Sequence, residues 1–243
     1  MALYDFGVAD DGTFYYVMEL LDGLDLSALV ERFGPVPPAR AVHFLRQVCA
    51  SLGEAHEAGL IHRDVKPANL YACRYGREVD FIKVLDYGLV KHQRPSAAGD
   101  GGEDLTAAQM SPGGTPAYMS PEQALGEGQL DARTDLYAVG CVAYWLLTGT
   151  LVFKGVTAME TLVMHVSREP EPPSRRTNRP IPPDLDEIVL ACLAKNPAAR
   201  PQTADELAER LGRARIGEVW TREQAMVWWQ ANVSPPSAAP APR

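Results

Sequence analysis

The fold is decided by one stretch of the 243-residue chain, His62-Arg63-Asp64-Val65-Lys66-Pro67-Ala68-Asn69 (residues 62–69). Asp64 and Asn69 lie five residues apart with Lys66 between them, and Pro67 predicts a loop rather than a helix. A carboxylate can orient an attacking hydroxyl and accept its proton, a lysine can neutralise a transferred phosphoryl group, and an amide oxygen can bind Mg²⁺. This combination of residues therefore suits phosphoryl transfer.

A second candidate metal ligand, Asp86, follows 17 residues after Asn69 in the sequence Asp86-Tyr87-Gly88. The run 79–85 predicts a short strand, so Asp86 is expected at a strand end where Gly88 permits a tight reversal. Each motif alone is a weak signal. An isolated Asp64 or Asn69 would more often cap a turn, and Asp86-Tyr87-Gly88 would more often be a plain turn.

Taken together and in this order, the motifs resemble the catalytic, C-terminal lobe of a protein kinase, among the bacterial relatives of the eukaryotic Ser/Thr kinases. The resemblance runs from Leu3 to about Leu211. It implies an α+β, protein-kinase-like fold with a mainly helical large lobe and a small β remnant of the other lobe. It also implies ATP and Mg²⁺, with catalytic Asp64 and Lys66 and the metal ligands Asn69 and Asp86.

The resemblance assigns further residues to binding and to structure. The segment 18–21 resembles the hinge that would bind the nucleotide, and Thr115 lies in a segment similar to the substrate loop, where it would hydrogen-bond Asp64 and Lys66. Ser120 and Tyr87 depart from the usual Ala and Phe of their motifs. The nucleotide-binding residues implied are Met18, Glu19, Leu21 and, near the ribose, Asp25; the structural ones are His62, Tyr87, Glu122, Asp135 and Arg200. Of these, Asp135 would tether the catalytic loop, Arg200 would pair with Glu122, and His62 would pack with Tyr87 and Leu3.

The family's nucleotide clamp has no counterpart in the 17 residues before Met18, which contain no glycine-rich loop and no Val-Ala-x-Lys. We therefore expect a truncated product, a misplaced start or one part of a split protein, with weak activity alone or none. A small-lobe-supplying chain or a kinase dimer would be a partner, beside protein substrates bearing Ser or Thr. The alternative is a non-catalytic binding module or decoy that docks kinase substrates.

Apolar periodicity predicts a helix from Pro38 to Gly59, a helix buried on nearly every face from 134 to 147, and helices over 184–195 and 203–214. A hairpin is expected from 3–7 and 14–18, ending in a turn at Asp22-Gly23. Thr221 is predicted to cap a short helix whose tryptophans pack on the large lobe. The expected divisions are 1–21 (small-lobe remnant and hinge), 22–216 (large lobe), 217–232 (Trp-rich helix) and 233–243 (disordered linker).

The composition limits the location and the partners. The chain is 46% hydrophobic with a formal net charge of −8, which argues against nucleic-acid binding through bulk positive charge. Four widely spaced cysteines and no apolar run of roughly 20 residues predict a cytoplasmic protein without disulfides or a membrane span. His43, His56, His92 and His165 lack ligand spacing, so packing or surface roles are expected.

Regulation is expected in the loop between Asp86 and Glu122. Arg63 and Lys91 could converge on a phosphate there and order the loop. Thr106 and Ser111 are the candidate phosphosites, and the lesser alternative is that both are ordinary solvated loop residues.

Overall fold

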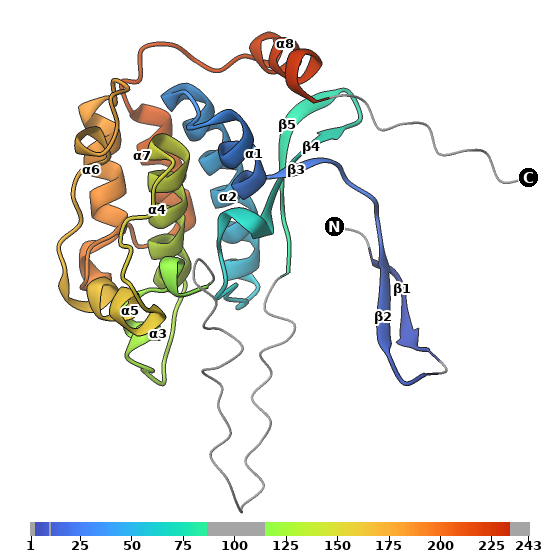
Figure 1. Ribbon diagram of the computed structural model, residues 1–243, viewed down its shortest axis with the longest axis horizontal. Coiled ribbons are helices and arrows are strands. Elements are labelled where there is room, and N and C mark those ends of the chain that lie inside the picture. Colours follow the sequence, from blue (N-terminus) through green and yellow to red (C-terminus); the bar gives the residue numbers. More distant parts are fainter. Residues whose placement is uncertain (1–2, 10, 87–114, 234–243) are drawn as a thin grey trace, which may run out of the picture.

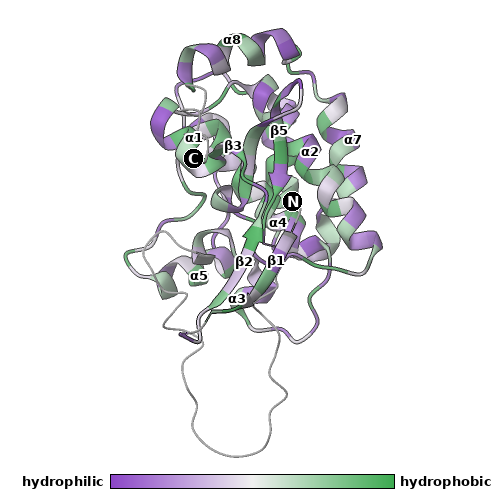
Figure 2. Ribbon diagram, turned by 90° about the vertical axis from the view of Figure 1, so that its right-hand side faces the viewer, coloured by the Kyte–Doolittle hydropathy of each residue, from purple (hydrophilic) through white to green (hydrophobic). Residues whose placement is uncertain are grey.

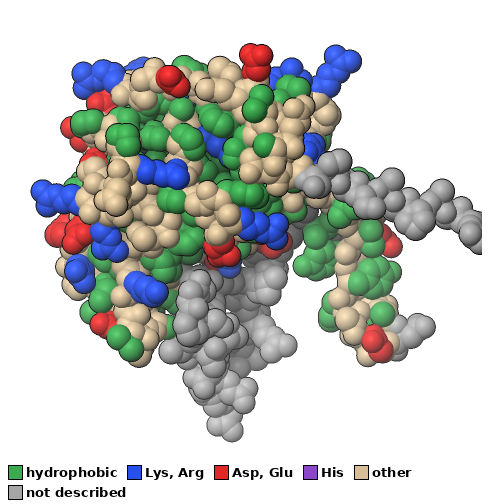
Figure 3. Space-filling model, turned by 45° about the horizontal axis from the view of Figure 1, so that its top comes forward, with side chains coloured by type: hydrophobic (Ala, Val, Ile, Leu, Met, Phe, Trp, Pro, Cys, Tyr) green, Lys and Arg blue, Asp and Glu red, His purple; other side chains and the backbone are tan. Residues whose placement is uncertain are grey.

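The computed structural model describes residues 3–9, 11–86 and 115–233. Its first element is an antiparallel hairpin of β1 (Leu3–Val8) and β2 (Phe14–Met18), which confirms the hairpin expected from the sequence (Figure 1). Gly12 in the connecting turn has φ 85°, a conformation that side chains with a Cβ rarely adopt. The hairpin carries many exposed apolar side chains, with Phe14 83% and Phe6 75% exposed (Figure 3).

A second antiparallel sheet has the order β3-β4-β5, formed by β3 (Asp22–Asp25), β4 (Leu70–Tyr75) and β5 (Glu78–Val84). β5 confirms the predicted strand, but the turn predicted at Asp22-Gly23 is wrong, because both residues pair with β4. Instead, the absence of a side chain at Gly23 allows β3 and β4 to lie close together. A Cβ at this position would lie 2.0 Å from the carbonyl oxygen of Ala72.

Helices make up most of the remaining described residues, and the four long helices predicted from periodicity are confirmed (Figure 1). The α-helices are α1 (Leu26–Phe33), α2 (Pro38–Glu57), α3 (Pro121–Ala124), α4 (Arg133–Thr148), α5 (Ala158–Ser167), α6 (Pro183–Cys192), α7 (Ala204–Arg213) and α8 (Arg222–Asn232). The 3-10 turns are η1 (Pro67–Asn69), η2 (Thr115–Tyr118), η3 (Pro173–Arg175) and η4 (Pro197–Ala199). Pro67 therefore opens a helical turn rather than excluding one, since a residue at the first helical position needs no N–H donor.

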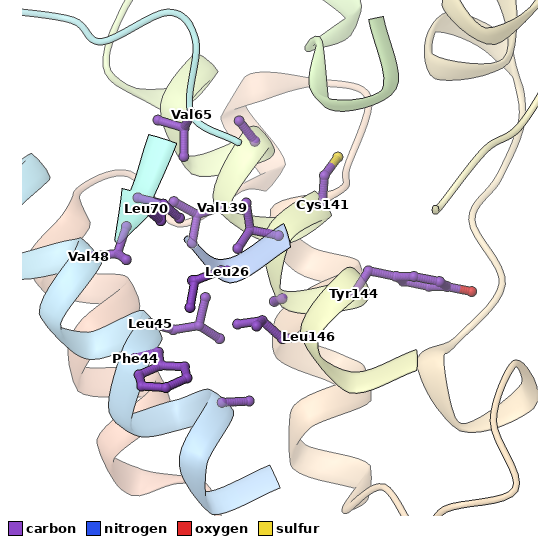
Figure 4. Close-up of a cluster of buried hydrophobic side chains, with 14 of the residues drawn as sticks. Leu26, Phe44, Leu45, Val48, Val65, Leu70, Val139, Cys141, Tyr144 and Leu146 are labelled. Atoms are coloured by element: carbon purple, nitrogen blue, oxygen red, sulfur yellow. The ribbon is translucent and has the colours of Figure 1, made fainter. Parts of the chain in front are cut away.

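The hydrophobic core is centred on α2 and α4 and also includes buried residues of α1, α6, α7, α8 and the three-stranded sheet, and the ribbon coloured by hydropathy shows apolar residues along these elements (Figure 2). Phe44, Leu45 and Val48 of α2 face Val139 and Leu146 of α4 (Figure 4). Fourteen residues of α4 are buried, confirming the prediction of a helix enclosed by protein. All four cysteines are buried free thiols, as expected for a chain without disulfides.

The C-terminal helix α8 begins at the predicted cap, Thr221, and is held by a buried carboxylate in β5. Asp80 accepts hydrogen bonds from Nε and Nη2 of Arg40 (2.9 and 2.7 Å) and from the indole N–H groups of Trp220 (2.8 Å) and Trp229 (2.6 Å). The Arg40 guanidinium also stacks on Trp228, 3.6 Å from the ring centroid. The prediction that these tryptophans pack on the large lobe is confirmed.

Candidate active site

The loop that carries Asp64 is fixed from below by Asp135, which projects from the first turn of the buried helix α4. Its two carboxylate oxygens accept the backbone N–H groups of His62 and Arg63, each over 2.8 Å. Nε2 of His56 donates to the same carboxylate, also over 2.8 Å. Since Asp135 is 0% exposed, these three donors compensate the cost of burying a carboxylate. Asp135 thus makes the backbone contacts expected of it.

His56 is a residue whose contact the sequence did not reveal, because packing or a surface role was expected for it. It lies in the last turn of α2, and its partner Asp135 is 79 residues away in the chain. His62 is fully buried, and its ring accepts the Asp64 N–H at Nδ1 and donates from Nε2 to the carbonyl of Leu85. The ring of His62 therefore joins the catalytic loop to the end of β5.

Within this loop, the side chains of Lys66 and Asn69 both contact the side chain of Asp64. Nζ of Lys66 lies 2.8 Å from Oδ2 of Asp64. Nδ2 of Asn69 donates to the backbone carbonyl of Asp64 (2.8 Å) and to its Oδ2 (3.2 Å). With the amide nitrogen used in this way, the orientation of Asn69 leaves its amide oxygen as the atom that a metal would use.

The end of β5 brings Asp86 beside this cluster. Leu70, next to Asn69, pairs with Val84, and the Leu85 N–H donates to the Asn69 carbonyl over 2.8 Å. Asp86 follows with φ 56° and is exposed. Its carboxylate and the Asn69 amide are hard oxygen donors, so this donor set fits Mg²⁺. Among the described residues, no three His, Cys, Asp or Glu side chains form a metal-binding group, so a metal here would need Asn69 and oxygen atoms of the substrate.

The predicted hinge residues lie in the part of the chain that runs from the end of β2 to the end of β3. Met18 ends β2, Glu19 and Leu21 follow it, and Asp25 ends β3. The Glu19 side chain forms an ion pair with Lys83 of β5. Asp25 Oδ1 accepts the Ala28 N–H over 2.9 Å, so this carboxylate caps α1.

The predicted substrate loop leads into a buried ion pair. Thr115 lies in η2, and α3 begins three residues after η2 ends. Glu122 of α3 accepts two hydrogen bonds from Arg200 (2.7 and 2.8 Å) and one from Thr134 (2.9 Å). Burial, the largest single effect, would raise the pKa of Glu122, but the hydrogen bonds and charge of Arg200 together with hydrogen bonds from the backbone and Thr134 hold the pKa below its ordinary value. The pair anchors α3.

Several residues named in the sequence analysis lie outside the described residues: Tyr87, Gly88, Lys91, His92, Thr106 and Ser111. The packing of His62 with Tyr87 and the phosphate pocket of Arg63 with Lys91 therefore stay predictions. Among the described residues, no helix is both long and apolar enough to cross a bilayer.

Comparison with known proteins agrees with this geometry. The family model for the protein kinase domain matches residues 2–211. The chain is 43% identical over 214 residues to serine/threonine-protein kinase pkn3 of Myxococcus xanthus, covering 87% of this chain and 38% of the relative. It is 41% identical over 223 residues to serine/threonine-protein kinase PknB of Mycolicibacterium smegmatis, covering 90% of this chain and 33% of the relative. The chain thus spans about a third of the length of these curated relatives.

Solved structures share the fold. The PknI kinase domain of Mycobacterium tuberculosis superimposes with a TM-score of 0.61 at 26% identity, covering 86% of this chain and 69% of that one. Rad53 residues 1–466, solved in complex with AMP-PNP, gives a TM-score of 0.65 at 26% identity, covering 86% of this chain and 48% of that one. The chain belongs to the protein kinase family.

Proposed function

We propose that this protein transfers the γ-phosphoryl group of ATP to Ser or Thr hydroxyls of other proteins. The observation that carries the proposal is the convergence of Lys66 and Asn69 on one carboxylate oxygen of Asp64, at 2.8 and 3.2 Å. The names of the relatives pkn3 and PknB support the choice of Ser/Thr as acceptor. Lys66 supports it as well, because this lysine resembles that of Ser/Thr kinases.

In the proposed mechanism, Asp64 orients the acceptor hydroxyl and accepts its proton as the oxygen attacks phosphorus. Lys66 neutralises the negative charge of the transferred group. Asn69 and Asp86 would hold Mg²⁺, which when bound shields the charge on the phosphate oxygens. Asp135 fixes the loop through two backbone hydrogen bonds, so that Asp64 need not be reoriented during the reaction.

The same proposal assigns the nucleotide and the acceptor to opposite sides of this cluster. Backbone groups of 18–21 would bind the adenine, with Asp25 near the ribose, and Thr115 would face the acceptor segment. A phosphate on Thr106 or Ser111 would pair with Arg63 and Lys91. The exposed apolar hairpin is consistent with a partner that supplies further small-lobe strands, either another chain or a second kinase.

The experiment is a phosphate-transfer assay with Mg-ATP and a Ser/Thr peptide library, comparing wild type with Asp64→Asn. We expect the variant to lose about 10²- to 10⁴-fold in kcat with nucleotide binding retained. The matched control is Asp184→Asn, which removes an equal charge at an exposed pair with Arg215 and should keep full activity. Equal rates for Asp64→Asn and wild type would refute the assigned role of Asp64. Substrate binding without transfer in the wild type would favour the non-catalytic binding module.

A further inference from the structure

The peptide group that joins Arg63 to Asp64 is hydrogen-bonded at both ends by side chains. Nε2 of Gln123 donates to the Arg63 carbonyl over 2.9 Å, and the Asp64 N–H donates to Nδ1 of His62 over 3.3 Å. Arg63 itself has φ 65°, and its N–H is bound by Asp135. The orientation of the backbone from which the Asp64 side chain projects is therefore set by three side chains, of which Gln123 is the one from α3.

Gln123 extends from a fixed base. Its Oε1 accepts the Ser120 N–H (3.1 Å), and its own N–H donates to Oγ of Ser120 (3.3 Å), which is a reciprocal cap of α3. Ser120 is 0% exposed. The preceding residue, Glu122, is held by Arg200 in the buried ion pair. Because the base is anchored, the position of the Gln123 amide can constrain the Arg63 carbonyl rather than follow it.

We infer that Gln123 is a positioning residue for Asp64, acting through the Arg63–Asp64 peptide group. The inference rests on the proposed function in one respect, that Asp64 is the group which receives the hydroxyl proton. Gln123 also lies five residues after η2 ends, so one side chain couples the segment proposed to receive the acceptor with the residue proposed to activate it. This coupling explains why a polar side chain reaches across to a carbonyl 60 residues away.

The test is Gln123→Glu in the full-length protein. The Glu carboxylate still accepts the Ser120 N–H, so the helix cap is retained. It has no N–H to donate to the Arg63 carbonyl, and instead places a carboxylate oxygen next to that carbonyl oxygen. Gln224→Glu is the matched control, because Gln224 forms the same reciprocal cap with Thr221 at the start of α8. It changes the same atoms of the same motif outside the site.

We expect kcat for Ser/Thr peptides to fall about three- to tenfold in Gln123→Glu, the loss of roughly one net hydrogen bond, with KM for Mg-ATP unchanged. Hydrogen exchange of the Asp64 amide should accelerate by a similar factor. Gln224→Glu should match wild type in kcat and in exchange at Asp64. Both variants are expected to keep the wild-type melting temperature, since both retain their caps.

Unchanged kcat and unchanged exchange in Gln123→Glu would overturn the inference, as would an equal loss in both variants. If the wild type transfers no phosphate even when a kinase small lobe is supplied, the proposed function fails, and exchange at the Asp64 amide alone decides the matter. Acceleration confined to Gln123→Glu would then still support the restraint on this peptide group, and its absence would overturn it.

Discussion

Replacing Asp80 by Asn tests whether one buried carboxylate joins α8, α2 and β5. Asn has nearly the same size and tolerates the left-handed backbone that Asp80 adopts at φ 56°, so the change removes charge without straining the chain. Arg40, which is 1% exposed, then loses its carboxylate partner. Burial already lowers the pKa of Arg40, which indicates how poorly the surroundings solvate the cation.

Removing one partner of a buried ion pair costs about 3–5 kcal/mol, because the other charge stays buried and uncompensated. For a domain of this size, the loss corresponds to a melting temperature lower by roughly 6–20 °C. Urea unfolding followed by tryptophan fluorescence is a suitable assay, since two of the four tryptophans donate to Asp80. Arg40→Met combined with Asp80→Asn should cost at least about 1 kcal/mol less than the sum of the single changes.

The control is again Asp184→Asn, which breaks a pair whose Arg215 side chain is 89% exposed and should cost no more than about 1 kcal/mol. The reasoning would be refuted if Asp80→Asn shifted the midpoint no further than this control. It would also be refuted if the double variant cost the full sum, because Arg40 and Asp80 would then be energetically independent.

Two further predictions concern α3 and α4. Glu122→Gln should destabilise the protein by about 3–5 kcal/mol at pH 7. The lowered pKa of Glu122 means that wild-type stability from this group is present above its ordinary pKa of 4.5 and is lost as the pH falls through the lower folded-state value. Wild type and variant should therefore converge in acid, and a constant gap in unfolding free energy from pH 7 to pH 3 would contradict the assignment. Gly140→Ala should cost about 1–3 kcal/mol, because the new Cβ would lie 2.6 Å from Cβ of Cys192, whereas Gly128→Ala meets nothing within 4 Å. Equal melting temperatures for the two alanine variants would show that α4 and α6 can separate without cost.

The sequence predicts those parts of the fold whose signal is periodic. The apolar positions of α2 and α4 repeat along the helix, so both helices could be recognised from the chain alone. The strand at Asp22-Gly23 could not, because its Gly is required by the backbone of Ala72, nearly fifty residues away. The residue types at Asp22 and Gly23 favour a turn, but their pairing with β4 makes them part of a strand.

The candidate site shows the same division. The order of Asp64, Asn69 and Asp86 in the chain predicts that they belong to one site, and the structure shows Asn69 in contact with Asp64. The contacts that hold them were not predictable for His56 and Gln123, since each meets its partner 60 or more residues away and belongs to no local motif. Asp80 gave no signal for a related reason, because a single acid in a strand is indistinguishable from a solvated one until Trp229 and its other donors are placed around it.

The junction at Asp80 also determines where this domain can be cut. The match to the protein kinase family model ends at residue 211, whereas tertiary contacts continue to Val233, whose carbonyl accepts a hydrogen bond from Arg74 of β4. A gene product shortened to residue 211 would keep every group of the candidate site and lose both indoles that meet Asp80. For recombinant expression, the boundary therefore belongs after Val233, where these tertiary contacts end, rather than at residue 211, where the match to the family model ends.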